Sequence, residues 1–355
     1  MSTLPGPPTP PEVILAHERG AENLATFRRG GAHTRVRRGA LVRTSESGAP
    51  WERADHLTLA RCAAVAAQLS CRFAFSHETA VLLHGGWIDH PDDLVHMSQW
   101  SSPNIVKGSD LRRHHAPWLR GGDVIEIHGL PVTSLERTMI DCAMALQPDR
   151  ALAAVDSLLR ILLNPRRDHP ERHAIRLAAV RAGLIEQLEE SPGRRGLVSA
   201  RAILAHADPL SESPGESKLR YIALAHGLPV PTTQMRVPTD AGVKYLDLGW
   251  LMRVQDGPDG RRLGYRVGAE YDGRAKYRPD QGSERGREGY RDDALYAEKV
   301  RADALGRAGV HPERFVHHHL MDPAAAVARM RAAFPAPVRP DLHPRPALMP
   351  SPGRR

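Results

Sequence analysis

The chain has 355 residues, of which 41% are hydrophobic, so it is long enough for two or three domains. Its formal net charge of +8 suits a polyanionic partner or a solvated basic surface. No stretch approaches the roughly 18 apolar residues of a membrane helix, and the N-terminus lacks the pattern of a signal peptide. The three cysteines include no CxxC pair, which argues against a disulfide framework and predicts a cytoplasmic protein.

The N-terminal segment is basic. Residues 1–11 are rich in proline and predicted to be disordered. Within residues 12–53, EVILAHERG predicts a short helix and TRVRRGALVRT alternates as a small hairpin does. No acidic residue lies between Glu22 and Glu46, so a winged-helix-like DNA-binding segment and a solvated basic arm both fit the pattern. The arginines that would contact DNA phosphates are Arg28, Arg29, Arg35, Arg37 and Arg38.

Residues 54–165 are predicted to form an α+β module. A long helix rich in alanine and leucine is followed by the short helix HETAVLLHG, which Ser76 caps and Gly85 ends. The segments DLVHMSQ and DVIEIHGLPV are predicted strands, and two further helices follow them. His77 and His84 flank the short helix and are interpreted as packing or capping residues rather than catalysts.

The character of the chain changes after the module. Residues 166–210 are charged and predicted to form a helical linker. Residues 211–322 predict the order α-β-β-β-α-β, and the last strand, ERFVHHHL, places His317 and His319 on one face. No second histidine cluster has zinc-like spacing, so these histidines are not interpreted as a metal site. Residues 323–355 predict a short helix and a disordered, proline-rich tail.

An unusual number of acidic residues lies in one predicted hairpin. Alternation along its second strand puts Glu270 and Asp272 on one face, and pairing brings Asp247 near Glu270. Glu216 lies in the first turn of the preceding helix, at the edge of its buried stripe. Converging carboxylates repel each other, and a Mg²⁺ or Mn²⁺ ion would remove the conflict because it prefers oxygen ligands. Lys276 would orient a water molecule or neutralise a phosphate.

Three of these residues also have simpler interpretations. Ser213 and Glu216 form an S-x-x-E capping box with proline at the first helical position, so Glu216 serves the helix whether or not it binds a metal. Asp272 precedes a glycine and is typical of the start of a turn. Lys276 is more simply explained as a solvated lysine than as a catalyst.

The two strand carboxylates have an alternative role in charge pairing. Asp247 and Glu270 would form salt bridges with Arg253 or Arg266 at the edge of the sheet, or would block pairing with another strand. Acidic residues are poor strand formers. Metal binding and charge pairing are therefore both judged by whether they explain an acid at Asp247 and another at Glu270.

With these residues in place, residues 211–322 resemble the PD-(D/E)xK restriction-endonuclease-like superfamily, and within it a bacterial group of unknown function close to the very-short-patch-repair mismatch endonucleases. The phrases SPGES, DLGW, EYDG and AEKVRADAL carry the similarity. The resemblance implies that Glu216, Asp247 and Glu270 bind Mg²⁺ and that a lysine two residues after the glutamate assists catalysis. That position holds Asp272, so Lys276 would be a migrated equivalent.

The upstream region, residues 12–165, resembles the type IV abortive-infection antitoxin family. The phrases SHETAVLLHG, GLPVTSLERTMIDCA and RVRRGALV carry this similarity. That family often begins with a winged helix that binds its own promoter. The resemblance implies DNA as a partner, with a toxin or a second copy of the chain as a further one.

The sequence therefore predicts an α+β or α/β protein: a winged-helix-like segment and an antitoxin-like module, followed by a restriction-endonuclease-like domain. The leading hypothesis is Mg²⁺-dependent hydrolysis of DNA phosphodiester bonds. Its candidate residues are Asp247, Glu270, Asp272 and Lys276 for catalysis, with Glu216, Asp247 and Glu270 as metal ligands. The alternative is a non-catalytic DNA-binding regulator or antitoxin with a degenerate nuclease fold, which Asp272 favours. An interaction protein with a basic surface is a third possibility.

Overall fold

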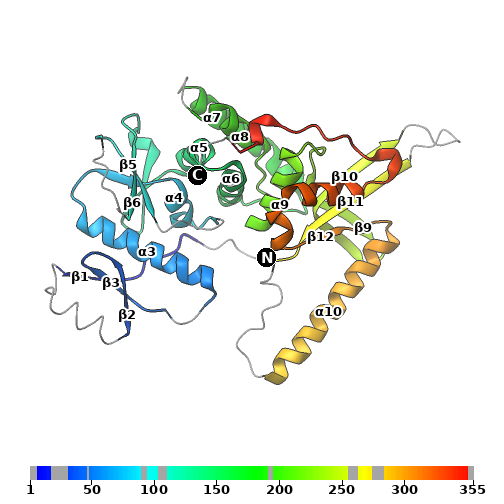
Figure 1. The fold of residues 1–355 in the computed structure, drawn as a ribbon, viewed down its shortest axis with the longest axis horizontal. Helices are drawn as coiled ribbons and strands as arrows, with labels where there is room; N and C mark the ends of the chain where they lie inside the picture. Colours follow the sequence, from blue (N-terminus) through cyan, green and yellow to red (C-terminus); the bar gives the residue numbers. More distant parts are fainter. Residues whose placement is uncertain are drawn as a thin grey trace.

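The computed structural model describes the chain in segments separated by short gaps. The described residues are 6–16, 31–45, 48–88, 94–102, 110–190, 195–254, 263–273 and 284–350. Helices and three separate sheets, of mixed or antiparallel type, make this an α+β protein (Figure 1). In the part of the chain that is described, no helix combines the length and apolarity needed to cross a membrane.

The first sheet is small and lies against a long helix. Its strands have the order β1-β3-β2, and its apolar face packs on α3 through Val36, Val42 and Ala60. The predicted hairpin is confirmed, with Gly39 at φ 75° in the turn. The bounds are β1 Val13–Leu15, β2 His33–Arg37, β3 Ala40–Arg43 and α3 Pro50–Gln68.

The predicted helix over EVILAHERG is wrong at its start. Val13–Leu15 is a strand that pairs antiparallel with β3, because the exposed edge of the hairpin offers hydrogen bonds that override the local preference. The remainder of that segment, and with it Arg28 and Arg29, lies outside the described residues.

The second sheet forms the centre of the α+β module. Its order is β6-β5-β4-β8-β7, with parallel pairing for β5–β6 and β4–β8 and antiparallel pairing for the other two pairs. Phe75, Met97 and Val132 fill its core. The bounds are β4 Phe73–Phe75, α4 His77–Leu83, β5 Val95–Gln99, β6 Leu111–His115, β7 Val124–Ile127, β8 Leu130–Thr133 and α5 Leu135–Ala145.

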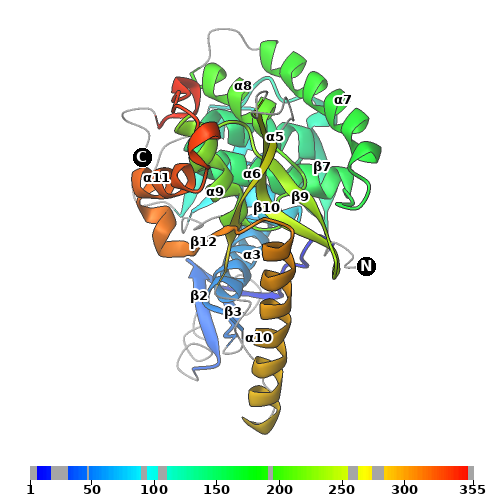
Figure 2. The ribbon, with the colours of Figure 1, turned by 90° about the vertical axis from the view of Figure 1, so that its right-hand side faces the viewer.

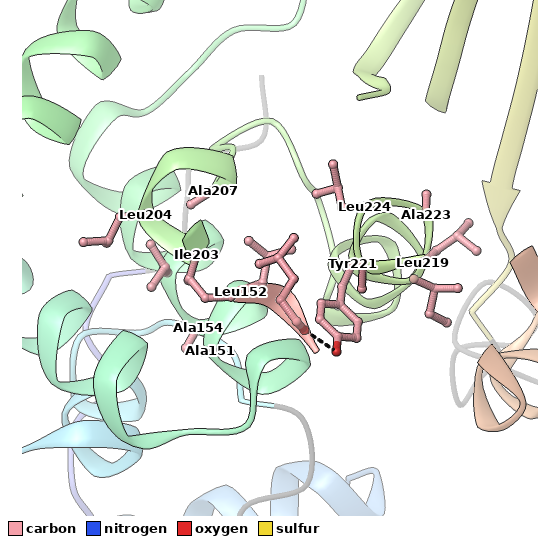
Figure 3. Close-up of a cluster of buried hydrophobic side chains, with 14 of the residues drawn as sticks. Ala151, Leu152, Ala154, Ile203, Leu204, Ala207, Leu219, Tyr221, Ala223 and Leu224 are labelled. Atoms are coloured by element: carbon pink, nitrogen blue, oxygen red, sulfur yellow. Dashed lines mark hydrogen bonds between the residues drawn. The ribbon is translucent and has the colours of Figure 1, made fainter. Parts of the chain in front are cut away.

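The helices that follow build one core shared by both halves of the chain. Leu152, Ile203 and Leu219 come from three different helices and all belong to this core (Figure 3). Residues 166–210, expected to be a linker, contribute the fully buried Leu188 to this core, because their helices are amphipathic. The bounds are α6 Pro148–Leu163, α7 Pro170–Glu189, α8 Leu197–His206 and α9 Pro214–Ala225.

The third sheet confirms the predicted order α-β-β-β-α-β. Its strands run β12-β11-β10-β9, antiparallel except for the parallel pair β11–β12. In Figure 1 and Figure 2, α10 extends well beyond the edge of this sheet. The bounds are β9 Thr232–Thr239, β10 Gly242–Val254, β11 Leu263–Tyr271, α10 Glu284–Arg307 and β12 Glu313–Phe315.

Two expectations for the C-terminal region are wrong. The last strand ends at Phe315, and His317–Met321 forms a 3-10 helix in which His319 Nδ1 accepts the N–H of Val316. After α11 (Pro323–Ala332), residues 333–350 are ordered against α9 instead of disordered. Leu348 is buried, and its carbonyl accepts a hydrogen bond from Tyr221 Oη at 2.9 Å (Figure 3).

Candidate functional site

Glu216 lies at the N-terminus of α9 and caps it. Its backbone N–H donates to Ser213 Oγ at 3.2 Å, and Ser213 Oγ donates to Glu216 Oε1 at 2.9 Å. The N–H of Glu212 donates to Glu216 Oε2 at 2.8 Å. The predicted capping role is therefore confirmed, and only 8% of the residue is exposed.

The start of α9 lies directly against the end of β11. A Cβ atom added at Gly215 would fall 2.0 Å from Cε1 of Tyr271, so only glycine allows this approach. Gln234 of β9 donates to Glu216 Oε2 at 3.4 Å. On the neighbouring strand β10, Asp247 is the residue opposite Gln234, because the residues on either side of the two are paired with each other. Helix and sheet thus bring Glu216 towards the strand carboxylates.

Asp247 and Glu270 are neighbours on adjacent strands. Leu248 pairs with Ala269, Asp247 and Glu270 are the next residues along their strands, and the N–H of Tyr271 donates to Asp247 Oδ2 at 2.8 Å. Burial, followed by the charge of Asp247, raises the pKa of Glu216 to about 8. The raised pKa favours the protonated form of the Glu216 carboxyl group, as expected when carboxylates are brought together out of water.

Arg301 of α10 lies among these carboxylates. Its Nη1 donates to Glu270 Oε2 at 3.0 Å, while Nη2 bonds Glu270 Oε1 and the carbonyl of Tyr245. Hydrogen bonding to Glu270 raises the pKa of Arg301 most, and the charges of Glu270, Asp247 and Asp272 add to it against the effect of burial. One guanidinium therefore bonds Glu270 and lies within the electrostatic influence of Asp247 and Asp272.

Asp272, which stands where the resemblance implies lysine, faces a second arginine. Arg314 of β12 lies 3.4 Å from Asp272 Oδ2 and 3.9 Å from Glu270 Oε2, and it also bonds Glu298. The prediction that the strand carboxylates form salt bridges is confirmed for Glu270, but the expected partners are wrong. Arg253 and Arg266 pair with Gly264 and Leu251 in the hairpin, several residues away along the strands.

The donor set can be tested against a metal. Glu216, Asp247 and Glu270 offer the oxygen ligands that Mg²⁺ prefers. Both oxygens of Glu270 are bonded to Arg301, and Glu216 carries a proton. Within the described ranges, these three do not form a group of ligand atoms all within 4.8 Å of one another. The residues fit Mg²⁺ by chemical type, provided that Arg301 moves away from Glu270 and Glu216 loses its proton.

The N-terminal arginines differ in what they can contact. Arg35 and Arg38 are exposed on the hairpin of β2 and β3. Arg37 is partly buried, and its Nε lies 3.2 Å from Asp110 Oδ2. Lys276, Arg28 and Arg29 lie outside the described residues. Of the predicted phosphate contacts, Arg35 and Arg38 are therefore the two that the structure places at the surface.

Sequence reasoning missed a cluster of three histidines in the second sheet. Potential ligand atoms of His77, His96 and His114 all lie within 4.8 Å of one another. The three residues are separated by 19 and 18 positions, which matches no short metal-binding motif. His96 lay in a predicted strand and His77 in a predicted helix, whereas the strand that carries His114 was not predicted, so no local pattern indicated the cluster.

Comparison with known proteins gives relatives but no function. No family model matches the chain. It is 29% identical over 153 residues to uncharacterised Mycobacterium tuberculosis proteins, Rv2248 of strain H37Rv and MT2308 of strain CDC 1551 / Oshkosh. The match covers 43% of this chain and 46% of each relative, so it spans less than half of either.

One solved structure is also similar in part. The crystal structure of the RV2827C protein from Mycobacterium tuberculosis aligns with 59% of this chain and 75% of its own. The sequence identity is 12% and the TM-score is 0.33. At that score the similarity supports no conclusion about fold or function.

Proposed function

We propose that the C-terminal domain is a Mg²⁺-dependent endonuclease-like domain that hydrolyses phosphodiester bonds of DNA. The observation that carries the proposal is the convergence of carboxylates from separate elements: Glu216 from α9, Asp247 from β10 and Glu270 from β11. Like charges that a fold brings together away from water need a compensating charge. A divalent cation supplies that charge and can also activate a water molecule for hydrolysis.

Each residue of the cluster has a role in this proposal. A bound Mg²⁺ would polarise the phosphate and lower the pKa of a water molecule. Asp247 and Glu270 supply oxygen ligands, and Glu216 joins them after losing its proton. Arg301 and Arg314 already carry positive charge beside the carboxylates, so they can neutralise a phosphate group once they release Glu270 and Asp272. Lys276 would support the water or the phosphate.

A second candidate function is a non-catalytic, DNA-binding regulator. The observation that favours it is the two-pronged bond of Arg301 to Glu270, because this arginine supplies the compensation that a metal would otherwise supply. Asp272 in place of lysine points the same way. In this case the protein would act in the cytoplasm through Arg35 and Arg38, together with a toxin or a second copy of the chain.

A cleavage assay separates the two candidates. Purified full-length protein is incubated with supercoiled plasmid, single-stranded DNA and mismatched duplex in Mg²⁺ or Mn²⁺. The test variant is Asp247→Asn/Glu270→Gln, which keeps the side-chain volumes. The matched control is Asp240→Asn, an exposed acid of the same sheet region that pairs with Arg307.

Each outcome assigns a function. Metal-dependent cutting by the wild type and the control, lost in the double variant by at least about a hundredfold, supports the nuclease. DNA binding without any cutting supports the regulator. Equal cutting by the double variant and the wild type would remove the acidic cluster from the proposal.

A further inference from the structure

The fold brings three histidines to one face of the second sheet. His96 on β5 and His114 on β6 share that face, because Ser98 pairs with His114 and lies two residues beyond His96. His77 opens α4 directly after β4, and the N–H of Ser76 donates to the carbonyl of His96 at 3.1 Å. Antiparallel pairing of β4 with β5 and parallel pairing of β5 with β6 therefore produce the cluster.

One nitrogen–nitrogen distance within the cluster matches the separation of two ligands of one metal ion. His114 Nε2 lies 3.3 Å from His96 Nδ1. The rings of His77 and His114 are stacked, with centroids 3.7 Å apart and planes at 15°, so one of the two rings has to turn before both can bind the same ion. Zinc–nitrogen bonds of about 2.0–2.1 Å in a tetrahedron place two ligating nitrogens roughly 3.3–3.4 Å apart. The His96–His114 pair is already at that separation.

A pair of hydroxyl groups orients the ring of His77. His77 Nδ1 lies 2.9 Å from Ser76 Oγ, which accepts a hydrogen bond from Ser98 Oγ at 2.9 Å. A hydrogen bond to one ring nitrogen selects the tautomer in which the other nitrogen is a ligand, as second-sphere partners of metal-bound histidines do. His77 also has φ at 52°, a conformation that costs energy for a residue other than glycine.

The cluster opens into a pocket. The cavity has a volume of about 490 Å³ and is lined by His77, His114, Ser98, Arg113, Trp118 and Asp141, among others. Structural zinc sites are closed by four protein ligands, whereas catalytic sites have three and leave one position open. Three histidines beside a cavity therefore match a site with three protein ligands and one open position.

We infer that His77, His96 and His114 bind one divalent transition-metal ion, with zinc as the expected metal, and that its fourth position faces this pocket. Imidazole nitrogens suit zinc and not magnesium, which separates this site from the acidic cluster. Arg113, which lines the pocket, would favour an anionic group, such as a carboxylate or a phosphate, as the ligand at the open position. The inference does not depend on the proposed nuclease function.

A zinc titration of the untagged, metal-stripped full chain tests the inference. Isothermal titration calorimetry gives affinity and stoichiometry, elemental analysis gives metal content, and the visible spectrum of the Co²⁺ form reports four-coordinate geometry. The test variants are His114→Ala and His96→Gln, the latter because His96 is buried. Circular dichroism checks that both are folded.

Two control variants separate this cluster from other histidines. His115→Ala changes the neighbouring residue on β6, which lines the pocket but is outside the group of three. His317→Ala/His318→Ala/His319→Ala removes the other histidine-rich segment. We expect one zinc ion per wild-type or control chain, and an affinity lowered by at least about a hundredfold in the test variants.

Other outcomes would overturn the inference. One is a wild-type chain that takes up less than one equivalent of zinc at micromolar concentration. The other is zinc binding that is lost in the His317→Ala/His318→Ala/His319→Ala variant and kept in the test variants. If the test variants do not fold, the wild type is modified with diethyl pyrocarbonate, which labels accessible histidines, in the presence and absence of zinc. Zinc must then protect His114, the partly exposed member of the group, and leave the exposed His115 reactive; equal labelling of His114 with and without zinc would contradict the site.

Discussion

The two larger sheets each gather a polar cluster, and the clusters differ in how charge is compensated. In the C-terminal sheet, Glu270 is bonded by Arg301 and Asp272 by Arg314. In the N-terminal module, His96 and His114 approach each other directly, with a nitrogen–nitrogen distance of 3.3 Å. Neutral imidazoles can meet in this way, whereas carboxylates removed from water need a counter-charge or a proton.

The difference determines what each cluster must give up to bind a metal. The acidic cluster has to release an arginine and a proton first, so its affinity for Mg²⁺ depends on the energy of the Arg301–Glu270 pair. The histidine cluster has to exchange the contact between His96 and His114, and the stacking of His77 on His114, for three metal bonds. We therefore expect the histidine cluster to bind its metal tightly, and the acidic cluster to bind Mg²⁺ weakly unless DNA is present.

The largest expected effect comes from the ion pair that joins the two regions. Asp156 of α6 accepts hydrogen bonds from Arg220 and Ser217 of α9, and its side chain has no exposed surface. Asp156→Ala leaves Arg220 buried without its partner and should lower the free energy of unfolding by about 3–5 kcal/mol. Urea denaturation followed by circular dichroism measures it.

The matched control for this variant is Asp240→Ala, which removes an exposed partner of Arg307 and should leave the midpoint unchanged. Because one core spans both regions, wild type and variant should each unfold in a single transition. Two separate transitions would mean that the clusters belong to independent folding units.

The next effect concerns the compensation of Glu270. Arg301→Met leaves this buried carboxylate without its two-pronged partner and should destabilise the protein by about 2 kcal/mol. Millimolar Mg²⁺ should restore stability in the variant more than in the wild type, because the metal can take the arginine's place. Denaturation with and without Mg²⁺ measures both. A variant that is insensitive to Mg²⁺ would favour the regulator.

A smaller effect is expected in the pH dependence of stability. The pKa of Glu216 is about 8 in the folded protein, raised by burial and by Asp247 from the usual value of 4.5. The folded state thus favours the protonated form, and this stabilisation is complete below pH 4.5 and is lost as pH rises towards 8. Relative to Glu216→Gln, the wild type should lose up to about 1.4 kcal/mol between pH 6 and pH 7.

Denaturation curves of both proteins at pH 5, 6, 7 and 8 give that difference. If the difference in unfolding free energy between the wild type and Glu216→Gln is constant with pH, the pKa of Glu216 is not raised in the folded protein. The carboxyl groups of Glu216 and Asp247 would then not repel each other.

The smallest effect concerns the basic hairpin and leaves stability unchanged. Arg35→Ala/Arg38→Ala should reduce the slope of log K against log salt for DNA binding by up to about 2, since each phosphate contact contributes roughly 0.9. Arg37→Ala should change the slope less, because Asp110 already holds Arg37. Fluorescence anisotropy between low and moderate salt measures the slope. Equal slopes for all three proteins would exclude this hairpin from the DNA interface.

Local patterns predicted much of the acidic site but not its counter-ions. Strand alternation and the S-x-x-E box placed Asp247, Glu270 and Glu216 correctly, because these patterns reflect backbone geometry over a few residues. Arg301 is 31 residues from Glu270 along the chain, on a helix whose direction relative to the sheet no local pattern specifies. The partners expected from the same hairpin, Arg253 and Arg266, were therefore wrong.

The histidine cluster could not be predicted for a related reason. His77, His96 and His114 come together only through the pairing of β4 with β5 and of β5 with β6. Likewise, the composition of the proline-rich tail predicts disorder, and only the contact of Leu348 with Tyr221 of α9 shows that the tail is ordered. Contacts between distant segments depend on packing energies that a short window of sequence does not contain.

By itself, the sequence determined the α+β class, the α-β-β-β-α-β order, the β2–β3 hairpin and the cap at Glu216. These features follow from periodicity and local hydrogen bonding, which act within a few residues. Only the tertiary structure decided that α7 and α8 join a common core, that arginines hold the carboxylates, and that three histidines meet beside a pocket. Those outcomes depend on which surfaces exclude water from one another, a property of the whole chain.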